Sequence, residues 1–217
     1  MLDALIVEPL QTADSAVIWL HGLGASQTDF EPVAQMLQPK LRSTRFILPQ
    51  APTQPVTVNG GYAMPSWYDI LEMSANKRAI NQQQLEQSAE SVMQLIEQQR
   101  DAGIDPQRIF LAGFSQGGAV VLHTAYLRWS GPLGGVLALS TYAPTFSPEL
   151  QPISTQRPAF VMHGLFDGVV PPAMGQAAFQ QLQAWQVESR WADYPMQHEV
   201  HPQQIKDIES WLEQHLN

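Results

Sequence analysis

Residues 109–118 read Ile-Phe-Leu-Ala-Gly-Phe-Ser-Gln-Gly-Gly, and this stretch decides the fold. It contains the pattern Gly-x-Ser-x-Gly centred on Ser115, after a predicted strand over Arg108–Ala112 and before a predicted helix over Gly117–Trp129. A strand that turns sharply into a helix holds the serine in a strained conformation, and the flanking glycines let neighbouring backbone approach. The pattern therefore predicts a nucleophilic serine above the end of a sheet. A glycine-rich turn that only starts a helix is the alternative.

Strand and helix patterns alternate along the rest of the chain. Short apolar or β-branched runs predict six further strands: Ala4–Val7, Ala16–Leu20, Arg45–Leu48, Gly135–Ser140, Ala159–His163 and Ser189–Tyr194. Apolar residues at helical spacing predict four further helices: Asp29–Leu37, a helix through Leu85 and Ile96 that stops near Ala102, Pro172–Val187 and Pro202–Leu216. Such alternation predicts an α/β fold in a single domain over residues 1–217, with a mostly parallel central sheet and helices on both faces.

Composition excludes several classes of function. The chain has 217 residues, no cysteine, and 11 basic against 20 acidic residues, which gives a net charge of −9. Without cysteine, thiol catalysis and cysteine-ligated metal sites are excluded. The negative charge repels phosphate backbones, so we expect no nucleic-acid partner. No apolar run is long enough to span a membrane, and the first residues lack a secretory pattern, so we expect a cytoplasmic protein without stable membrane insertion.

A serine hydroxyl needs a base to become a nucleophile, and the base needs an acid that orients it. In folds with this strand–turn–helix motif, the acid and then the histidine follow the serine along the chain. Asp167 comes just after the predicted strand Ala159–His163, at the end where ligand-facing groups gather, whereas Asp193 lies inside a strand pattern. His198 follows the last strand through a short loop, and His201 is the alternative base. The expected triad is therefore the motif serine with Asp167 and His198.

Acyl transfer also requires backbone N–H groups that stabilise the oxyanion. We expect these donors to be Gln116, which follows the nucleophile, and Leu23, in the glycine-rich turn His21–Gly24 after an early strand. This turn does not continue into the dinucleotide-binding pattern, because Gln27 stands where that pattern needs glycine. The run His198–His201 lacks the spacing of a zinc-protease motif, so we expect no metal and no cofactor.

Residues 49–67 form a long segment with four prolines and no clear strand or helix pattern. Long loops of this kind are often functional, and we expect a flap that lines a pocket. A loop that packs on the surface for stability alone is the alternative. The side chains expected to line an apolar substrate pocket are Met64, Trp67, Phe166 and Val169, together with Leu23. An apolar pocket favours short-to-medium acyl chains over charged acyl groups.

Taken together, the motifs resemble the phospholipase/carboxylesterase family of α/β-hydrolases, which includes acyl-protein thioesterases. The similarity covers nearly the whole chain and rests on five stretches: Leu20–Gly24, Ser66–Asp69, Gly113–Gly118, His163–Pro171 and Tyr194–Val200. The resemblance implies a minimal α/β-hydrolase without a large cap domain. It also implies the triad and the oxyanion donors expected above, and it places the loop that lines the acyl pocket at residues 49–67.

From the residues and the resemblance we expect a serine carboxylesterase. It would hydrolyse carboxylic esters with short-to-medium acyl chains through an acyl-enzyme. An acyl-protein thioesterase or a lysophospholipase is the alternative within the enzymes, and a non-catalytic ligand-binding hydrolase fold is the alternative outside them. The expected partner is a small-molecule ester or acyl thioester. A homodimer through an exposed apolar rim is left open.

Overall fold

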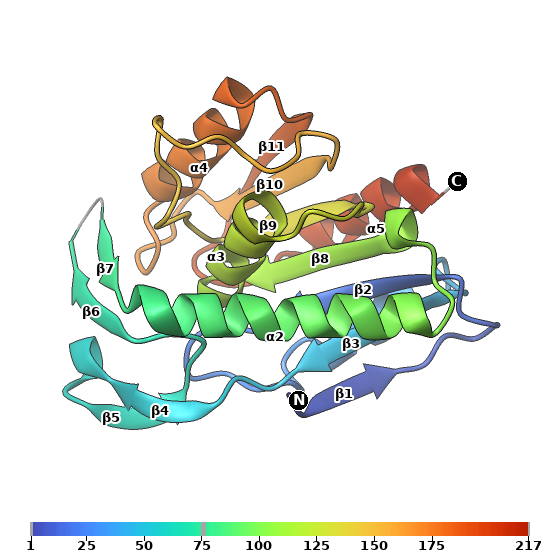
Figure 1. Cartoon of the computed structure of the whole chain (residues 1–217), viewed down its shortest axis with the longest axis horizontal. Helices are drawn as coiled ribbons and strands as arrows, with labels where there is room; N and C mark the ends of the chain where they lie inside the picture. Colours follow the sequence, from blue (N-terminus) through green and yellow to red (C-terminus); the bar gives the residue numbers. More distant parts are fainter. Residues whose placement is uncertain (1, 75–76, 217) are drawn as a thin grey trace.

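A mostly parallel sheet of seven strands forms the centre of the molecule in the computed structural model, which describes residues 2–74 and 77–216 (Figure 1). In spatial order the strands are β1 (Ala4–Val7), β3 (Thr44–Pro49), β2 (Ser15–Leu20), β8 (Ile109–Phe114), β9 (Gly135–Leu139), β10 (Ala159–Gly164) and β11 (Ser189–Tyr194). Only β1, at the edge, runs antiparallel to its neighbour; the other pairs in this sheet are parallel. The α/β fold and the strands predicted from the sequence are confirmed.

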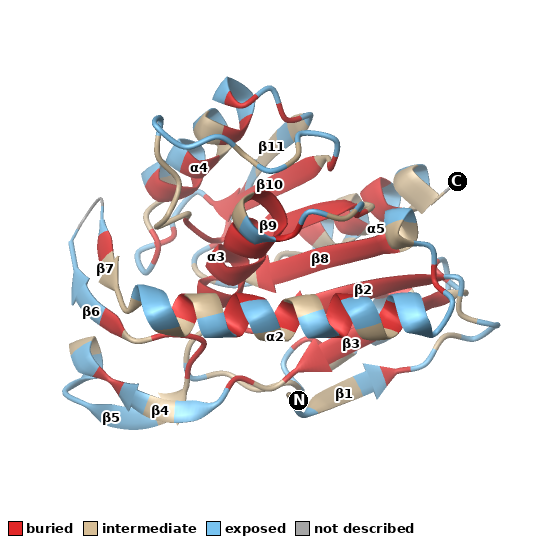
Figure 2. Ribbon diagram, viewed as in Figure 1, coloured by how far each residue is buried: buried red, intermediate tan, exposed pale blue. Residues whose placement is uncertain are grey.

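Helices cover both faces of this sheet. The face that carries Ile18 packs against α2 (Gln82–Asp101), α3 (Gln116–His123) and α4 (Pro172–Ala184), and the face that carries Trp19 packs against α1 (Glu31–Leu37) and α5 (Pro202–Leu216). Figure 2 shows that the inner strands are buried over nearly their whole length. Burial on both faces explains why these strands read as continuous apolar runs rather than as alternating ones.

Two predicted helix ends differ from the structure. The helix expected to continue to Trp129 is α-helical only to His123 and then widens into a π-helical turn over Thr124–Arg128, where the Trp129 N–H donates to the Thr124 carbonyl at 2.8 Å. The helix expected to reach Val187 stops earlier, because Gln186 has a positive φ of 61° that no helix accepts. None of the helices in residues 2–74 and 77–216 has the length and apolar character that a membrane span needs.

The segment expected as a flap, residues 49–67, contains a short hairpin, and a second hairpin follows it in the chain. Strands β4 (Thr53–Val56) and β5 (Tyr62–Pro65) form one antiparallel hairpin, and β6 (Ile70–Met73) and β7 (Arg78–Ile80) form a second. Both hairpins lie near the N-terminal end of α2, on the side of the molecule where the parallel strands end (Figure 1). Their strands are three or four residues long and largely exposed, so they carry no apolar alternation that sequence reasoning can detect.

Candidate active site

Ser115 lies at the turn between β8 and α3 with φ 53° and ψ −120°, a conformation that is rare and strained for a residue with a side chain. Two groups at the end of β9 and just after it hold it there. The Ser115 N–H donates to the Leu139 carbonyl at 2.9 Å, and the Thr141 hydroxyl donates to the Ser115 carbonyl at 2.5 Å. The sheet thus fixes the backbone of this serine at the carboxyl end of β8.

The glycines around Ser115 are required by close packing of backbone. A Cβ on Gly113 would overlap the backbone of Gly117, and a Cβ on Gly117 would come within 2.5 Å of the His21 carbonyl oxygen. A Cβ on Gly118 would come within 2.5 Å of the Thr141 side chain. Real Cβ atoms do not approach so closely, so the motif glycines let the turn sit directly against the neighbouring strands.

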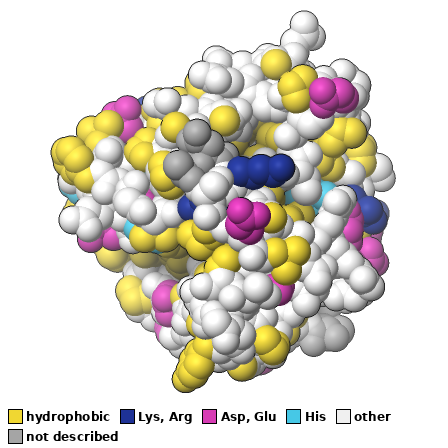
Figure 3. All heavy atoms as spheres, turned by 90° about the vertical axis from the view of Figure 1, so that its left-hand side faces the viewer, with side chains coloured by type: hydrophobic (Ala, Val, Ile, Leu, Met, Phe, Trp, Pro, Cys, Tyr) yellow, Lys and Arg dark blue, Asp and Glu magenta, His cyan; other side chains and the backbone are white. Residues whose placement is uncertain are grey.

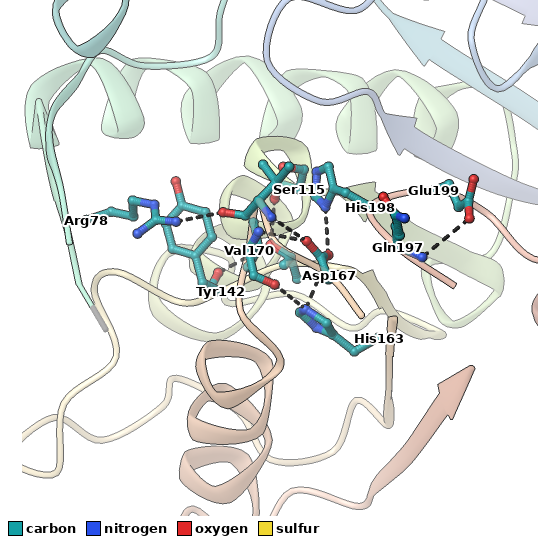
Figure 4. Close-up of polar contacts among 11 residues, drawn as sticks. Arg78, Ser115, Tyr142, His163, Asp167, Val170, Gln197, His198 and Glu199 are labelled. Atoms are coloured by element: carbon teal, nitrogen blue, oxygen red, sulfur yellow. Dashed lines mark hydrogen bonds and ion pairs between the residues drawn. The ribbon is translucent and has the colours of Figure 1, made fainter. Parts of the chain in front are cut away.

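An acid and a histidine pair at the same end of the sheet. The Nδ1 atom of His198, in the loop after β11, lies 2.7 Å from Oδ2 of Asp167, in the loop after β10 (Figure 4). The other carboxylate oxygen accepts from the backbone N–H groups of Val169 and Val170 at 2.9 and 2.8 Å. Burial alone would raise the pKa of Asp167, but the hydrogen bonds from His198 and from these amides together lower it. The carboxylate is therefore ionised and held in one orientation.

The structure brings the three expected triad residues together. Ser115 and His198 line the same cavity, and Figure 4 shows them close to each other with Asp167 behind the imidazole. The His198 ring packs against Phe114, with 4.6 Å between ring centroids. The alternative base, His201, instead stacks on Tyr194 beside α5 with centroids 6.1 Å apart, and it is not among the residues that line the cavity.

The two expected oxyanion donors also belong to this cavity. Leu23 and Gln116 line it together with Ser115. The turn that carries Leu23 is held from outside the cavity, because the Gly24 N–H donates to the Pro65 carbonyl at 2.8 Å and the indole N–H of Trp67 donates to the His21 carbonyl at 2.8 Å.

Gln116 fixes the same region through its side chain. Its Oε1 accepts from the Trp67 N–H at 2.8 Å, and its Nε2 donates to the Tyr68 carbonyl at 2.7 Å. Residues near the end of the 49–67 segment therefore support the turn of the expected oxyanion site from behind. Sequence reasoning expected this segment at the pocket wall and missed that supporting position.

The cavity has a volume of about 420 Å³ and a mainly apolar lining. Of the expected pocket residues, Leu23 and Val169 line it, whereas Met64, Trp67 and Phe166 do not. Trp67 is buried in the support just described, and the Phe166 side chain is 66% exposed. The lining residues that sequence reasoning missed are Ala25, Asp29, Phe30, Val33, Ile70, Met73, Arg78, Phe114, Tyr142, Val170, Glu199 and Val200.

These missed residues come mainly from α1 and its preceding turn, from the β6–β7 hairpin, and from the loop after β11, with one each from β8 and the loops after β9 and β10. Apart from the helix pattern of α1, no local signal in the sequence marks them. No group of three or more His, Asp or Glu residues that could hold a metal ion occurs within the described ranges.

Residues 1–216 match the family model for Phospholipase/Carboxylesterase. The chain belongs to this family. An acyl-protein thioesterase 1 from Cryptococcus neoformans is 38% identical over 230 residues, which cover 97% of this chain and 96% of the relative. A rice (Oryza sativa) protein with the name "Probable carboxylesterase" is 34% identical over 208 residues, which cover 93% of this chain and 78% of the relative.

The fold of this family member agrees with solved structures. The crystal structure of SOBER1 from Arabidopsis thaliana superimposes with a TM-score of 0.85 at 31% identity, and the match covers 94% of this chain and 99% of that one. The identification of the α/β-hydrolase fold and of the phospholipase/carboxylesterase family, made from the motifs, is therefore confirmed.

Proposed function

We propose that this family member is a serine carboxylesterase that uses Ser115 as nucleophile, His198 as general base and acid, and Asp167 as the group that orients the imidazole. One observation carries the proposal: a histidine held by a buried carboxylate at 2.7 Å lines the same cavity as a serine in a strained turn. The fixed carboxylate keeps the proton of His198 on Nδ1, so Nε2 is free to accept the proton of the serine.

The reaction proceeds in two steps. Ser115 Oγ attacks the ester carbonyl while His198 Nε2 takes its proton, and the N–H groups of Leu23 and Gln116 stabilise the oxyanion. The bond to the alcohol or thiol then breaks, and His198 returns the proton to this leaving group. Water next attacks the acyl-enzyme by the same route, which releases the acid and restores the serine.

The substrate is a small ester or an acyl thioester. The cavity of about 420 Å³, with mostly apolar walls, supports a short-to-medium acyl chain as the bound group. Hydrolysis of acyl groups on protein cysteines is the second candidate, because the Cryptococcus relative is named an acyl-protein thioesterase. Lysophospholipid hydrolysis, a cytoplasmic location and a homodimer stay predictions.

Covalent labelling tests the proposed nucleophile. A fluorophosphonate reacts with an activated serine, so the intact mass of the protein is expected to rise by one adduct located on Ser115. Ser115→Ala is expected to abolish the adduct and to lower kcat by about 10⁶-fold. Ser91→Ala, on the exposed side of α2, is the control that keeps both labelling and turnover. Normal turnover by Ser115→Ala would refute the mechanism, and a wild-type protein that neither reacts nor turns over esters would favour the non-catalytic alternative.

A further inference from the structure

Arg78 places a buried positive charge at the wall of the cavity. This residue begins β7, lines the cavity and is only 6% exposed. Its Nη1 donates to the carbonyls of Ser74 and Lys77 at 2.5 and 3.3 Å, and its Nη2 donates to the Val169 carbonyl at 2.8 Å. These acceptors are neutral. Within residues 2–74 and 77–216, no carboxylate forms an ion pair with this guanidinium.

A buried charge without a counter-charge is costly, so its presence beside a cavity points to an anionic ligand. The backbone carbonyls satisfy several N–H groups of Arg78 but leave its charge uncompensated. Tyr142, whose ring lies 5.9 Å from the guanidinium, cannot supply a negative charge, because burial raises its pKa to about 12. A bound carboxylate would complete the arrangement.

A second cavity lies beyond Arg78. It has a volume of about 330 Å³ and shares Arg78 and Tyr142 with the active-site cavity, so these two side chains form the boundary between the cavities. Its charged lining residues are Lys77 and Arg78, and its remaining lining is Tyr142, Ala143, Pro144, Phe146, Met174, Ala177, Ala178 and Gln181. Figure 3 shows this side of the molecule, with separate groups of hydrophobic side chains and a Lys or Arg side chain near its centre, above an Asp or Glu side chain.

The position of Arg78 relative to the proposed triad decides which part of a substrate it meets. Figure 4 shows Arg78 and Tyr142 on one side of Ser115, and His198 and Glu199 on the other. If His198 protonates the leaving group, the leaving group lies on the His198 side and the acyl chain extends toward Arg78. This step rests on the proposed function.

We propose that Arg78 and Lys77 bind a carboxylate at the far end of the acyl chain, so that the preferred substrates are esters or thioesters of dicarboxylic acids with one free carboxylate. The apolar side chains of Ile70, Met73 and Val169 contact the methylenes between the two ends. Hydrolysis of such a monoester consumes one water and releases the dicarboxylic acid and the alcohol or thiol. This proposal differs from the sequence-based expectation that charged acyl groups are disfavoured, and the two expectations predict opposite substrate preferences.

Two esters with acyl chains of equal length test the proposal: mono-p-nitrophenyl adipate, which carries a free carboxylate, and p-nitrophenyl hexanoate, which does not. The ratio of their kcat/KM values is measured with the wild-type chain and variants. We expect Arg78→Gln to lower the adipate-to-hexanoate ratio about tenfold or more, because a charge-assisted hydrogen bond is lost. Arg78→Lys is expected to retain most of the ratio. Arg100→Gln, which removes the same charge from the exposed end of α2, is expected to leave it unchanged.

A purely structural role of Arg78 gives a different result. In that case Arg78→Gln lowers both rates alike and the ratio stays within twofold of the wild type, which overturns the proposal. If Arg78→Gln does not fold, two measurements replace it. Lys77→Gln is expected to lower the same adipate-to-hexanoate ratio, and the free acids are compared as inhibitors of hexanoate ester hydrolysis by the wild-type chain. We expect adipate to inhibit more strongly than hexanoate, and added salt to reduce the difference. Equal inhibition by the two acids would also overturn the proposal.

A third ester locates the anion. The hexanoate ester of 3-hydroxybenzoate carries its carboxylate on the leaving group. Its kcat/KM is therefore expected to be the same in the wild-type chain and in Arg78→Gln. A loss on Arg78→Gln equal to that of the adipate ester would place the anion on the His198 side and refute the acyl assignment. Failure of the proposed function looks different: no ester is hydrolysed and Ser115 takes up no fluorophosphonate.

Discussion

At the scale of single residues, His163 shows how a buried side chain outside the triad bears on the proposed chemistry. Its Nε2 lies 2.8 Å from the Val170 carbonyl and 3.5 Å from Oδ2 of Asp167, and its ring stacks on Trp191 with centroids 6.0 Å apart. Burial lowers the pKa of His163, so the imidazole is neutral. With the proton on Nε2, His163 donates a hydrogen bond to the Val170 carbonyl, and its neutral ring adds no positive charge beside Asp167. The hydrogen bonds to the Asp167 carboxylate come from His198 and from the backbone amides.

We therefore predict that His163 is a positioning residue for Asp167. It acts through Val170, whose carbonyl it binds and whose N–H donates to the Asp167 carboxylate. His163→Leu removes the donor and is expected to lower kcat about tenfold with little change in KM, since one orienting hydrogen bond is lost. His163→Gln, whose Nε2 can donate at a similar place, is expected to recover most of kcat. Steady-state kinetics on p-nitrophenyl hexanoate measure both variants. Equal losses in the two variants, or a loss in KM alone, would contradict the positioning role.

The residues predicted from the sequence were those whose chemistry leaves a local pattern. Ser115 lies in a five-residue motif, and Asp167 and His198 follow the ends of recognisable strands. Arg78 had no such signal, because its importance comes from what surrounds it in space: three carbonyls, a tyrosine ring and two cavities. The burial of Arg78 depends on tertiary packing, so the residues next to it in the sequence do not predict it.

At the scale of elements, the predictable parts are those buried on both faces. The strands β2, β8 and β10 carry long apolar runs because helices cover them on both sides, and such runs are readable. The hairpin strands are only three or four residues long and partly exposed, so their sequences show no recognisable two-residue repeat of apolar side chains. The segment 49–67 was predicted as important for the site, but its supporting role depends on the hydrogen bond that the Trp67 indole donates and the one that the Pro65 carbonyl accepts, and no sequence pattern reveals either.

The contact between α4 and β10 offers a test at this scale. Gly175 of α4 faces His163 of β10 so closely that a Cβ at position 175 would overlap the imidazole. We predict that Gly175→Ala destabilises the fold by about 1–3 kcal/mol, because the buried ring cannot move without strain. For a chain of this size that lowers Tm by about 2–10 °C in a thermal unfolding scan.

Gly168→Ala is the matched control for this prediction. A Cβ at position 168 would meet open space, so we expect a change in unfolding free energy within about 0.5 kcal/mol. A Tm for Gly175→Ala equal to that of the wild type would mean that the helix can shift away from β10 without loss, and would refute the tight contact.

At the scale of the whole molecule, the fold buries three histidines that the proposed triad does not use. Burial is the main cause that lowers the pKa of His21, His123 and His163 below the ordinary value of 6.5. The unfolded chain therefore binds more protons than the native state once the pH falls below about 6.5. The free energy of unfolding therefore decreases as the pH falls below about 6.5. The contribution of these neutral histidines to stability is fully present above about pH 6.5.

We predict that the free energy of unfolding falls by at most about 3 kcal/mol between pH 6.5 and 5.5, because each neutral buried histidine contributes about 1 kcal/mol over this interval. Urea titrations at pH 7.5, 6.5 and 5.5 measure the change. The lowered pKa of Asp167 affects stability only at pH values near and below the ordinary carboxyl range, which lies below this interval. The His163→Gln variant removes one titrating ring and is expected to lose about a third of the pH dependence. A flat profile in the wild type, or an unchanged slope in this variant, would show that these rings accept protons in the native state.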